Sequence, residues 1–164
     1  MLACGLAAQE ARISGRLVDT PAQGAVRGMQ ITGDGTRVVF TVDATVQGEI
    51  ELWSALSDGS APSVRLSPTL GENEDVLGDF TVNGEQVFFR VGLEGRLYRA
   101  ALDGSAQAQR LDAAVPGDGV ESFELSPDGQ HLVYETGGPD SELYLVPADG
   151  SAAPFELGDG LGDS

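Results

Sequence analysis

Carboxylates are the side chains of this sequence with the greatest capacity for chemistry. The 164 residues carry 26 Asp and Glu against nine Arg and no Lys, which gives a net charge of −17. Glu49/Glu51 and Glu72/Glu74 are pairs of carboxylates two residues apart, but nothing around them indicates the burial that would raise one pKa for acid–base catalysis. The Asp-Gly-rich stretches 116–120 and 158–164 lack the Asp-x-Asp-x-Asp-Gly spacing of a calcium loop.

Nucleophiles and bases are scarce. His131 is the only histidine, and it stands beside a turn at the start of an expected strand, which is typical of a surface residue rather than a base. No Gly-x-Ser-x-Gly elbow occurs, so the chain lacks that mark of a serine hydrolase. Cys4 is the only cysteine, which excludes an internal disulfide framework and a cysteine-based zinc site. We therefore expect no catalytic constellation, no metal site and no cofactor.

The charge restricts the partners. A chain this acidic repels nucleic acid and anionic membrane surfaces, so a charged partner would be a cationic protein or peptide. The simpler interpretation is that the acids keep turns and loops soluble. No stretch approaches the roughly 18 apolar residues of a membrane span.

The chain contains three copies of one sequence repeat, over 29–66, 78–111 and 123–157. The glycines of a first turn, Gly35, Gly84 and Gly129, are 49 and 45 residues apart. A second turn has its glycines 45 and 46 residues apart, at Gly59, Gly104 and Gly150. Such a period indicates one supersecondary unit used repeatedly.

Each repeat predicts four strands. The first strand ends at Ile31, Phe80 or Leu125, and the Asp-Gly or Asn-Gly turn after it is the strongest short-range hairpin signal, because both residues tolerate positive φ. The second strand holds an unbroken apolar triplet, which indicates burial on both faces. These triplets are Val38-Val39-Phe40, Val87-Phe88-Phe89 and Leu132-Val133-Tyr134. The third strand carries Leu52-Trp53, Leu97-Tyr98 or Leu143-Tyr144. In the fourth strand apolar and polar residues alternate.

Four-stranded units with buried inner strands must stack on one another, which predicts an all-β fold, a partial β-propeller of three four-stranded antiparallel blades. We expect the blades at about 26–66, 77–111 and 121–157, within a single domain over 11–164 that follows an unstructured segment over 1–10. Residues 11–18 are expected to form an N-terminal strand that belongs to a further blade. Propellers usually have at least four blades, so we expect a piece of a larger propeller. The alternatives are an open array of blades, or chains that self-associate through exposed blade faces to close the ring.

The third repeat, "LSPDGQHLVYETGGPDSELYLVPADGS", resembles the WD40-like propeller repeat of TolB-type proteins and of the propeller in prolyl-oligopeptidase-type peptidases. The first copy has Thr32-Gly33 in place of Ser-Pro, and the second has Val82-Asn83. The resemblance implies a non-catalytic scaffold for protein or ligand binding that works outside the cytoplasm, in the periplasm or at the cell surface. The alternative is the propeller of a larger serine peptidase whose catalytic domain is not in this chain.

The N-terminus bears on location. Residues 2–5, Leu-Ala-Cys-Gly, resemble the end of a bacterial lipobox, which would make Cys4 a lipid anchor if the true start lay upstream. The alternative is that Cys4 is an ordinary residue.

Loops of variable length suggest where binding would occur. In a four-stranded meander, the second-to-third loops and the linkers between blades share one end, and these connections differ in length among the repeats, whereas the other turns do not. We expect a binding face at this end, formed by Asp43, Glu74, Asp75, Asp118 and Asp140. Solvated loop charge is the alternative.

Overall fold

Twelve strands form three separate four-stranded sheets in the computed structural model, which describes residues 25–43, 48–112 and 119–158. Within each sheet the strands follow chain order and every neighbouring pair is antiparallel. The protein is therefore all-β, built of propeller blades. The expected strand over 11–18 and the segment 1–10 lie outside the described residues. Among the residues that are described, no helix is long and apolar enough to cross a membrane.

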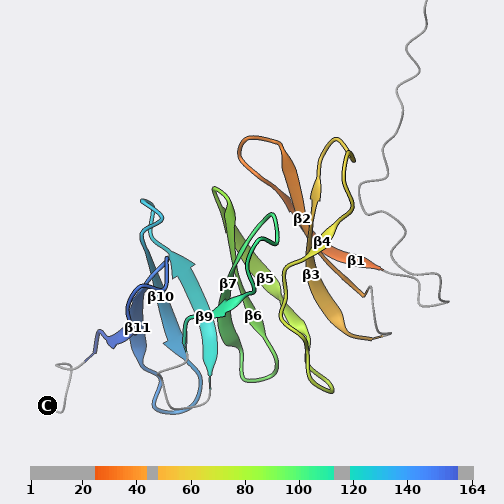
Figure 1. The fold of residues 1–164 in the computed structure, drawn as a ribbon. Helices are drawn as coiled ribbons and strands as arrows, with labels where there is room; N and C mark the ends of the chain where they lie inside the picture. The colour runs from red at the N-terminus through yellow and green to blue at the C-terminus, as the bar shows by residue number, and fades with distance from the viewer. Residues whose placement is uncertain (1–24, 44–47, 113–118, 159–164) are drawn as a thin grey trace, which may run out of the picture.

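The blades stand side by side in chain order (Figure 1). Blade 1 consists of β1 (Val26–Ile31), β2 (Arg37–Asp43), β3 (Ile50–Leu56) and β4 (Val64–Arg65). Blade 2 consists of β5 (Val76–Asn83), β6 (Gln86–Val91), β7 (Arg96–Ala101) and β8 (Gln109–Arg110). Blade 3 consists of β9 (Val120–Leu125), β10 (His131–Thr136), β11 (Leu143–Pro147) and β12 (Phe155–Glu156).

The first turns of blades 1 and 3 are hairpin turns at the expected Asp-Gly positions, and they share one geometry. The N–H of Gly35 donates to the carbonyl of Thr32 at 2.8 Å, and Gly129 repeats this contact with Ser126 at 2.8 Å. Gly35 has φ of 72° and Gly129 of 70°, whereas Asp34 is not in the positive-φ region. The arrangement is that of a type I turn followed by a left-handed glycine. Asp34 therefore does not use the positive φ that it tolerates, and its carboxylate accepts a hydrogen bond from the backbone N–H of Thr36.

The first turn of blade 2 is two residues shorter. Asn83 pairs with Gln86, so only Gly84 and Glu85 connect the strands, and of these two only Gly84 has positive φ. The first strand therefore runs to Asn83, and its expected end at Phe80 was wrong. Phe80 pairs with Phe89 in the register in which Met29 pairs with Phe40. A change of two residues keeps the alternation of side chains, so the buried face is preserved.

Two apolar cores lie between the blades. We call the face of a blade that points toward the next blade in the chain its downstream face, and the opposite face its upstream face. Val39 and Leu52 on the downstream face of blade 1 cluster with Val87, Phe89 and Ala100 on the upstream face of blade 2. The second core is built in the same way from both sides of the junction between blades 2 and 3, with Phe88, Leu97, Leu132, Tyr134 and Tyr144. Stacking, rather than any single sheet, therefore buries the apolar triplets.

The central position of each triplet is equivalent in register but not in burial. Val39, Phe88 and Val133 pair with Ser54, Arg99 and Leu145 at matching positions of the third strands. Val39 and Phe88 are buried, as expected. Val133 is only half-buried, because it lies on the face of blade 3 that points away from blade 2.

Candidate functional site at the loop end

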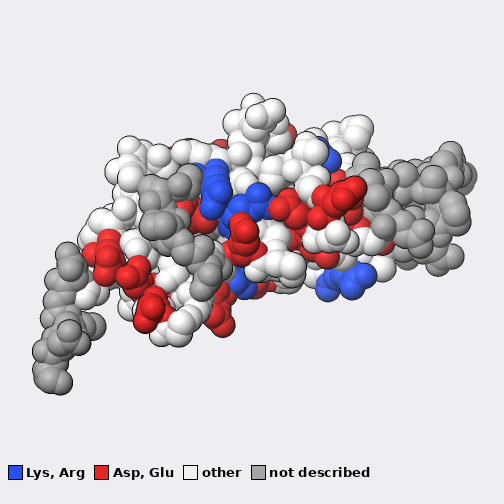
Figure 2. Space-filling model, turned by 90° about the horizontal axis from the view of Figure 1, so that it is seen from below, with Lys and Arg blue, Asp and Glu red and all other residues white. Residues whose placement is uncertain are grey.

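The variable loops and the linkers gather at one end of the array, which we call the loop end, and the Gly-containing hairpin turns lie at the other, the turn end. The loop end is formed by the β2–β3, β6–β7 and β10–β11 connections and by the two linkers between blades. Figure 2 views this end and shows arginine side chains over the middle of the array, with carboxylates on both sides of them.

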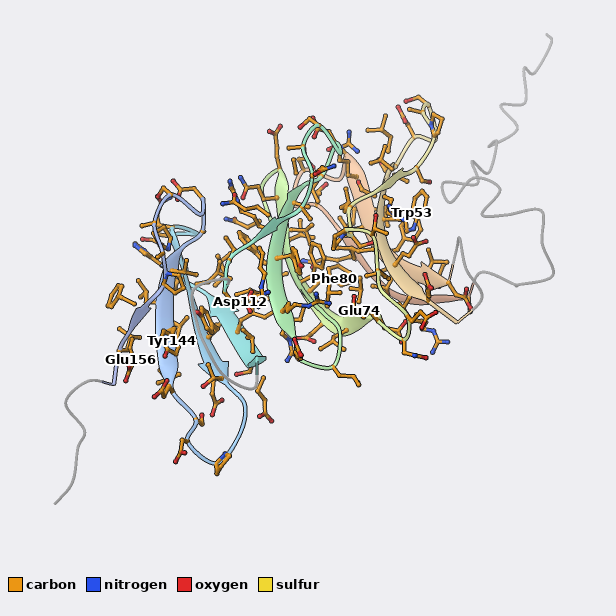
Figure 3. All side chains as sticks on the ribbon, turned by 60° about the horizontal axis from the view of Figure 1, so that its bottom comes forward. Trp53, Glu74, Phe80, Asp112, Tyr144 and Glu156 are labelled. Carbon is orange, nitrogen blue, oxygen red and sulfur yellow. The ribbon has the colours of Figure 1, made fainter. Side chains whose placement is uncertain are left out.

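Glu74, which Figure 3 labels, and Asp75 lie in the linker from blade 1 to blade 2, and both accept hydrogen bonds within the protein. Glu74 forms an ion pair with Arg96 and accepts a hydrogen bond from the N–H of Gly71 at 2.8 Å. Asp75 Oδ1 accepts from the N–H of Ile50 at 2.7 Å, which ties the linker to β3. These two carboxylates therefore shape the loop end in addition to contributing charge to it.

Asp43 lies near Asp75, because it is the partner of Ile50 across β2 and β3. Its Oδ2 accepts a hydrogen bond from Gly48 N–H at 3.0 Å, while Oδ1 is buried and accepts none from the described residues. Asp140 lies apart from this group, exposed in the β10–β11 loop. The structure thus brings Asp43, Glu74 and Asp75 together at the junction of blades 1 and 2 and places Asp140 on blade 3. Asp118 and Cys4 lie outside the described residues.

The sequence reasoning missed the arginines of blade 2. Arg90 and Arg96 stand on either side of the short β6–β7 connection, so both reach the loop end. Their positions on the two sides of the Gly92–Gly95 turn could have indicated from the sequence that both arginines lie at the loop end. Arg90 pairs with Asp79 at 2.8 Å, and in blade 2 Arg110 pairs with Asp112 at 2.8 Å. With the Arg96–Glu74 pair, each of these three cations is neutralised inside the protein.

Arg90 also joins two blades. Besides Asp79, its guanidinium donates to the carbonyl of Val120 at 2.9 Å and to the carbonyl of Glu121. Both carbonyls belong to the start of β9, where a bulge leaves Glu121 without a pairing partner on β10. Bulges often re-aim a side chain at the rim of a sheet. Here the bulge leaves the carboxylate of Glu121 exposed.

Five exposed carboxylates at the loop end form no ion pair with a described residue. They are Glu72 in the first linker, Glu94 in blade 2, and Glu121, Asp140 and Glu142 in blade 3. No three His, Cys, Asp or Glu among the described residues approach closely enough to hold a metal ion. The loop end therefore presents a dispersed negative surface around a neutralised row of arginines.

The turn-end aspartates have a structural role. Oδ1 of Asp34, Asp58, Asp103, Asp128 and Asp149 accepts the N–H two residues on at 2.9 to 3.0 Å in each case. Hydrogen bonds from Thr32 and Thr36 lower the pKa of Asp34 to about 2, and hydrogen bonds from neighbouring residues lower the pKa of the other four. His131 is exposed at this end, at the start of β10.

Comparisons with known proteins bear on the fold. No protein-family model matches the chain, and no curated protein matches it. Among solved structures the chain is similar to the tricorn protease, with a TM-score of 0.57 and 13% identity over 80% of this chain and 13% of that one. The chain is also similar to a putative TolB from Agrobacterium tumefaciens, with a TM-score of 0.54 and 16% identity over 85% of this chain and 47% of that one. For TolB from Acinetobacter baumannii the TM-score is 0.50 and the identity is 20%, over 82% of this chain and 32% of that one.

At these identities the likeness shows a shared fold, a TolB-like β-propeller arrangement. The chain spans less than half the length of each of these three structures.

Proposed function

We propose that this chain is a non-catalytic propeller scaffold that binds a cationic peptide or protein at its loop end, outside the cytoplasm. One observation carries the proposal: the loop-end arginines of blade 2 are neutralised by internal partners, and the exposed Arg27 is outnumbered by exposed carboxylates without an ion pair. These carboxylates include Glu72, Glu94, Glu121 and Asp140. The surface left for a partner is therefore negative. Such a surface attracts cations from a distance and orients them on encounter.

The scaffold supports this role. Blade stacking gives a rigid frame, and loops on a rigid frame are where proteins usually place binding residues. The extracytoplasmic location is supported by the resemblance of the repeat to TolB-type proteins and by the fold likeness to two TolB structures. Fractionation of cells that express the complete native gene tests the location, and recovery in the cytosol would contradict it.

The binding proposal is tested with a fluorescent Lys/Arg-rich peptide and the full 164-residue chain. We expect binding that weakens as salt rises, because exposed charges act through a screened field. A Glu94→Gln/Glu121→Gln/Asp140→Asn triple variant should bind about three- to thirtyfold more weakly, as expected for three exposed charge pairs. The matched control is Glu85→Gln, which removes an exposed charge at the turn end. Equal losses in the triple variant and the control, or no peptide binding, would contradict the proposal.

A second candidate is the propeller of a larger peptidase, of the prolyl-oligopeptidase type. The likeness to the tricorn protease, of which this chain spans 13%, favours a part of a larger enzyme. The complete coding sequence decides between the two. Further propeller repeats alone favour the binding scaffold, whereas an α/β-hydrolase domain with a Gly-x-Ser-x-Gly elbow favours the peptidase.

A further inference from the structure

A cavity of about 460 Å³ opens at the turn end, between blades 1 and 2. Its walls are the first turns of both blades and the second turn of blade 2, and its lining residues include Asp34, Arg37, Glu85, Asp103 and Ser105. Cavities of this size suit small molecules. This one lies at the end of the array opposite the loop end, so it is separate from the surface proposed for a cationic partner.

Arg37 is the cation of this cavity, and contacts with both blades hold its guanidinium in place. Nη1 donates to the carbonyl of Leu102 in blade 2 at 3.1 Å and to Oγ of Ser54 in blade 1 at 3.3 Å. Arg37 forms no ion pair with a described residue, and Nε and Nη2 donate to none of them. Nε and Nη2 form one edge of the guanidinium, and such an edge matches the two oxygens of a carboxylate. That edge is therefore available to a ligand.

Asp103 places a carboxylate next to this guanidinium, because it follows Leu102, whose carbonyl Arg37 contacts. Oδ1 of Asp103 accepts the N–H of Ser105 at 2.9 Å, which fixes the turn. Hydrogen bonds from Ser105 lower the pKa of Asp103, and the charge of Arg37 lowers it further, so the carboxylate is ionised at neutral pH. The cavity thus holds a guanidinium and a carboxylate side by side that form no ion pair with each other.

The remaining charge of the cavity is negative. Asp34 is engaged by its own turn, since its oxygens accept hydrogen bonds from the two neighbouring threonines. Glu85 is exposed and forms no ion pair with a described residue. With Asp103, three carboxylates surround one guanidinium, so the field of the cavity disfavours an anion, while Arg37 repels a simple cation. A molecule that carries both charges satisfies Arg37 and Asp103 together.

The equivalent crevice between blades 2 and 3 lacks this combination. Gln86 takes the place of Arg37, since each is the first residue of the second strand of its blade. Asp149, in the second turn of blade 3, takes the place of Asp103 and lines the crevice together with Gln86. The second crevice therefore keeps the carboxylate and has an amide where the first has a guanidinium.

We propose that the cavity between the turns of blades 1 and 2 binds a free α-amino acid as its zwitterion. The α-carboxylate lies on Nε and Nη2 of Arg37, and the α-ammonium lies on the carboxylate of Asp103. These two groups of the ligand are attached to one carbon atom, which matches protein groups that lie side by side. Each end of a peptide carries only one of the two charges, so the site selects free amino acids. The excess of carboxylates disfavours the acidic ones.

An NMR titration of the ¹⁵N-labelled 164-residue chain with L-serine, L-leucine, L-lysine and L-glutamate tests the proposal. We expect at least one of the first three to bind with a dissociation constant of about 1 mM or lower, and L-glutamate to bind more weakly. The shifted amides should be those of residues 101–105 and 84–85. The N-acetyl and amide derivatives of the best binder each lack one charge, and they should bind at least about tenfold more weakly.

Two variants identify the residues that hold the zwitterion. Arg37→Met and Asp103→Asn should each raise the dissociation constant about ten- to hundredfold, because each removes one charge-assisted contact. Asp103→Asn keeps a side-chain oxygen for the N–H of Ser105, so it preserves the turn and carries the test even if Arg37→Met unfolds. The matched control is Asp149→Asn, the same change in blade 3, which should bind like the wild type.

Three results would overturn the proposal. They are the absence of shifts with all four amino acids, an equal loss of affinity in Asp103→Asn and Asp149→Asn, and undiminished binding of the N-acetyl and amide derivatives.

Discussion

Tyr134 and Tyr144 stack on neighbouring strands of blade 3, with ring centroids 5.4 Å apart and ring planes 16° from parallel. Their hydroxyls have different environments. The hydroxyl of Tyr144 donates to Glu142 at 2.6 Å, whereas the hydroxyl of Tyr134 is buried and has no hydrogen-bond partner among the described residues. The repeat position of Tyr134 is occupied by phenylalanine in blades 1 and 2, at Phe40 and Phe89.

Tyr134→Phe should leave the protein as stable or make it more stable, by up to about 1 kcal/mol. An unpaired buried polar group costs desolvation that phenylalanine does not, and the ring stacking is retained. Urea unfolding followed by tryptophan fluorescence measures the change, with Tyr144→Phe as the contrasting variant because it removes a hydrogen bond. A loss of more than about 1 kcal/mol for Tyr134→Phe would show that the hydroxyl has a partner in solution.

Alkaline pH should unfold the protein gradually above about pH 10. The hydrogen bond to Glu142 is the main cause that raises the pKa of Tyr144 to about 12, and burial is the main cause that raises the pKa of Tyr134. A raised pKa in the folded state contributes stability that is complete below the unfolded value of 10.0 and is lost as pH rises toward the folded value. Absorbance of tyrosinate at alkaline pH, compared between wild type and Tyr144→Phe, reports this. Full ionisation of Tyr144 near pH 10 would contradict it.

Acid should weaken the turn end between about pH 4 and pH 2. The five turn aspartates have pKa values below 3.8, and that of Asp34 is about 2, because neighbouring N–H and hydroxyl groups donate to the carboxylates. A lowered pKa contributes stability that is present above the unfolded value and is lost as pH falls through the folded one. The melting temperature should therefore drop over this range, and less steeply in Asp34→Asn. Equal slopes in the two proteins would argue against a role for Asp34.

Gly95→Ala should destabilise the protein by roughly 2–4 kcal/mol, the range of severe single substitutions. A Cβ there would lie 2.0 Å from the carbonyl oxygen of Val120, and the φ of +62° disfavours any side chain. Gly78→Ala is the matched control, since a Cβ at Gly78 meets nothing within 4 Å. Thermal melts of the two variants check this, and similar melting temperatures would show that the β6–β7 connection can move away from β9.

The repeat itself determined much of the fold. Alternation, apolar triplets and paired turn glycines are local patterns with a fixed period, so they predict strands, hairpins and stacking without any knowledge of distant contacts. The buried positions of Val39 and Phe88 and the turn-forming role of Asp34 follow from that pattern alone. The length of the first turn in blade 2 escaped it, because "NG" fits either a turn centred on Asn83-Gly84 or one formed by Gly84 and Glu85, and only the register of β5 on β6 distinguishes them.

The character of the loop end and of the outer faces was decided by tertiary structure. The sequence gives the number of acidic residues in the loops. Whether a carboxylate faces water or neutralises an arginine depends on tertiary contacts, such as that of Glu74 with Arg96, which are 22 residues apart. In the same way, Leu97 and Leu143 have identical places in their repeats. Leu97 is buried because blade 3 packs against it, whereas Leu143 is half exposed because no described blade does. Local sequence sets the direction in which a side chain points, and the stacking of whole blades sets what it meets there.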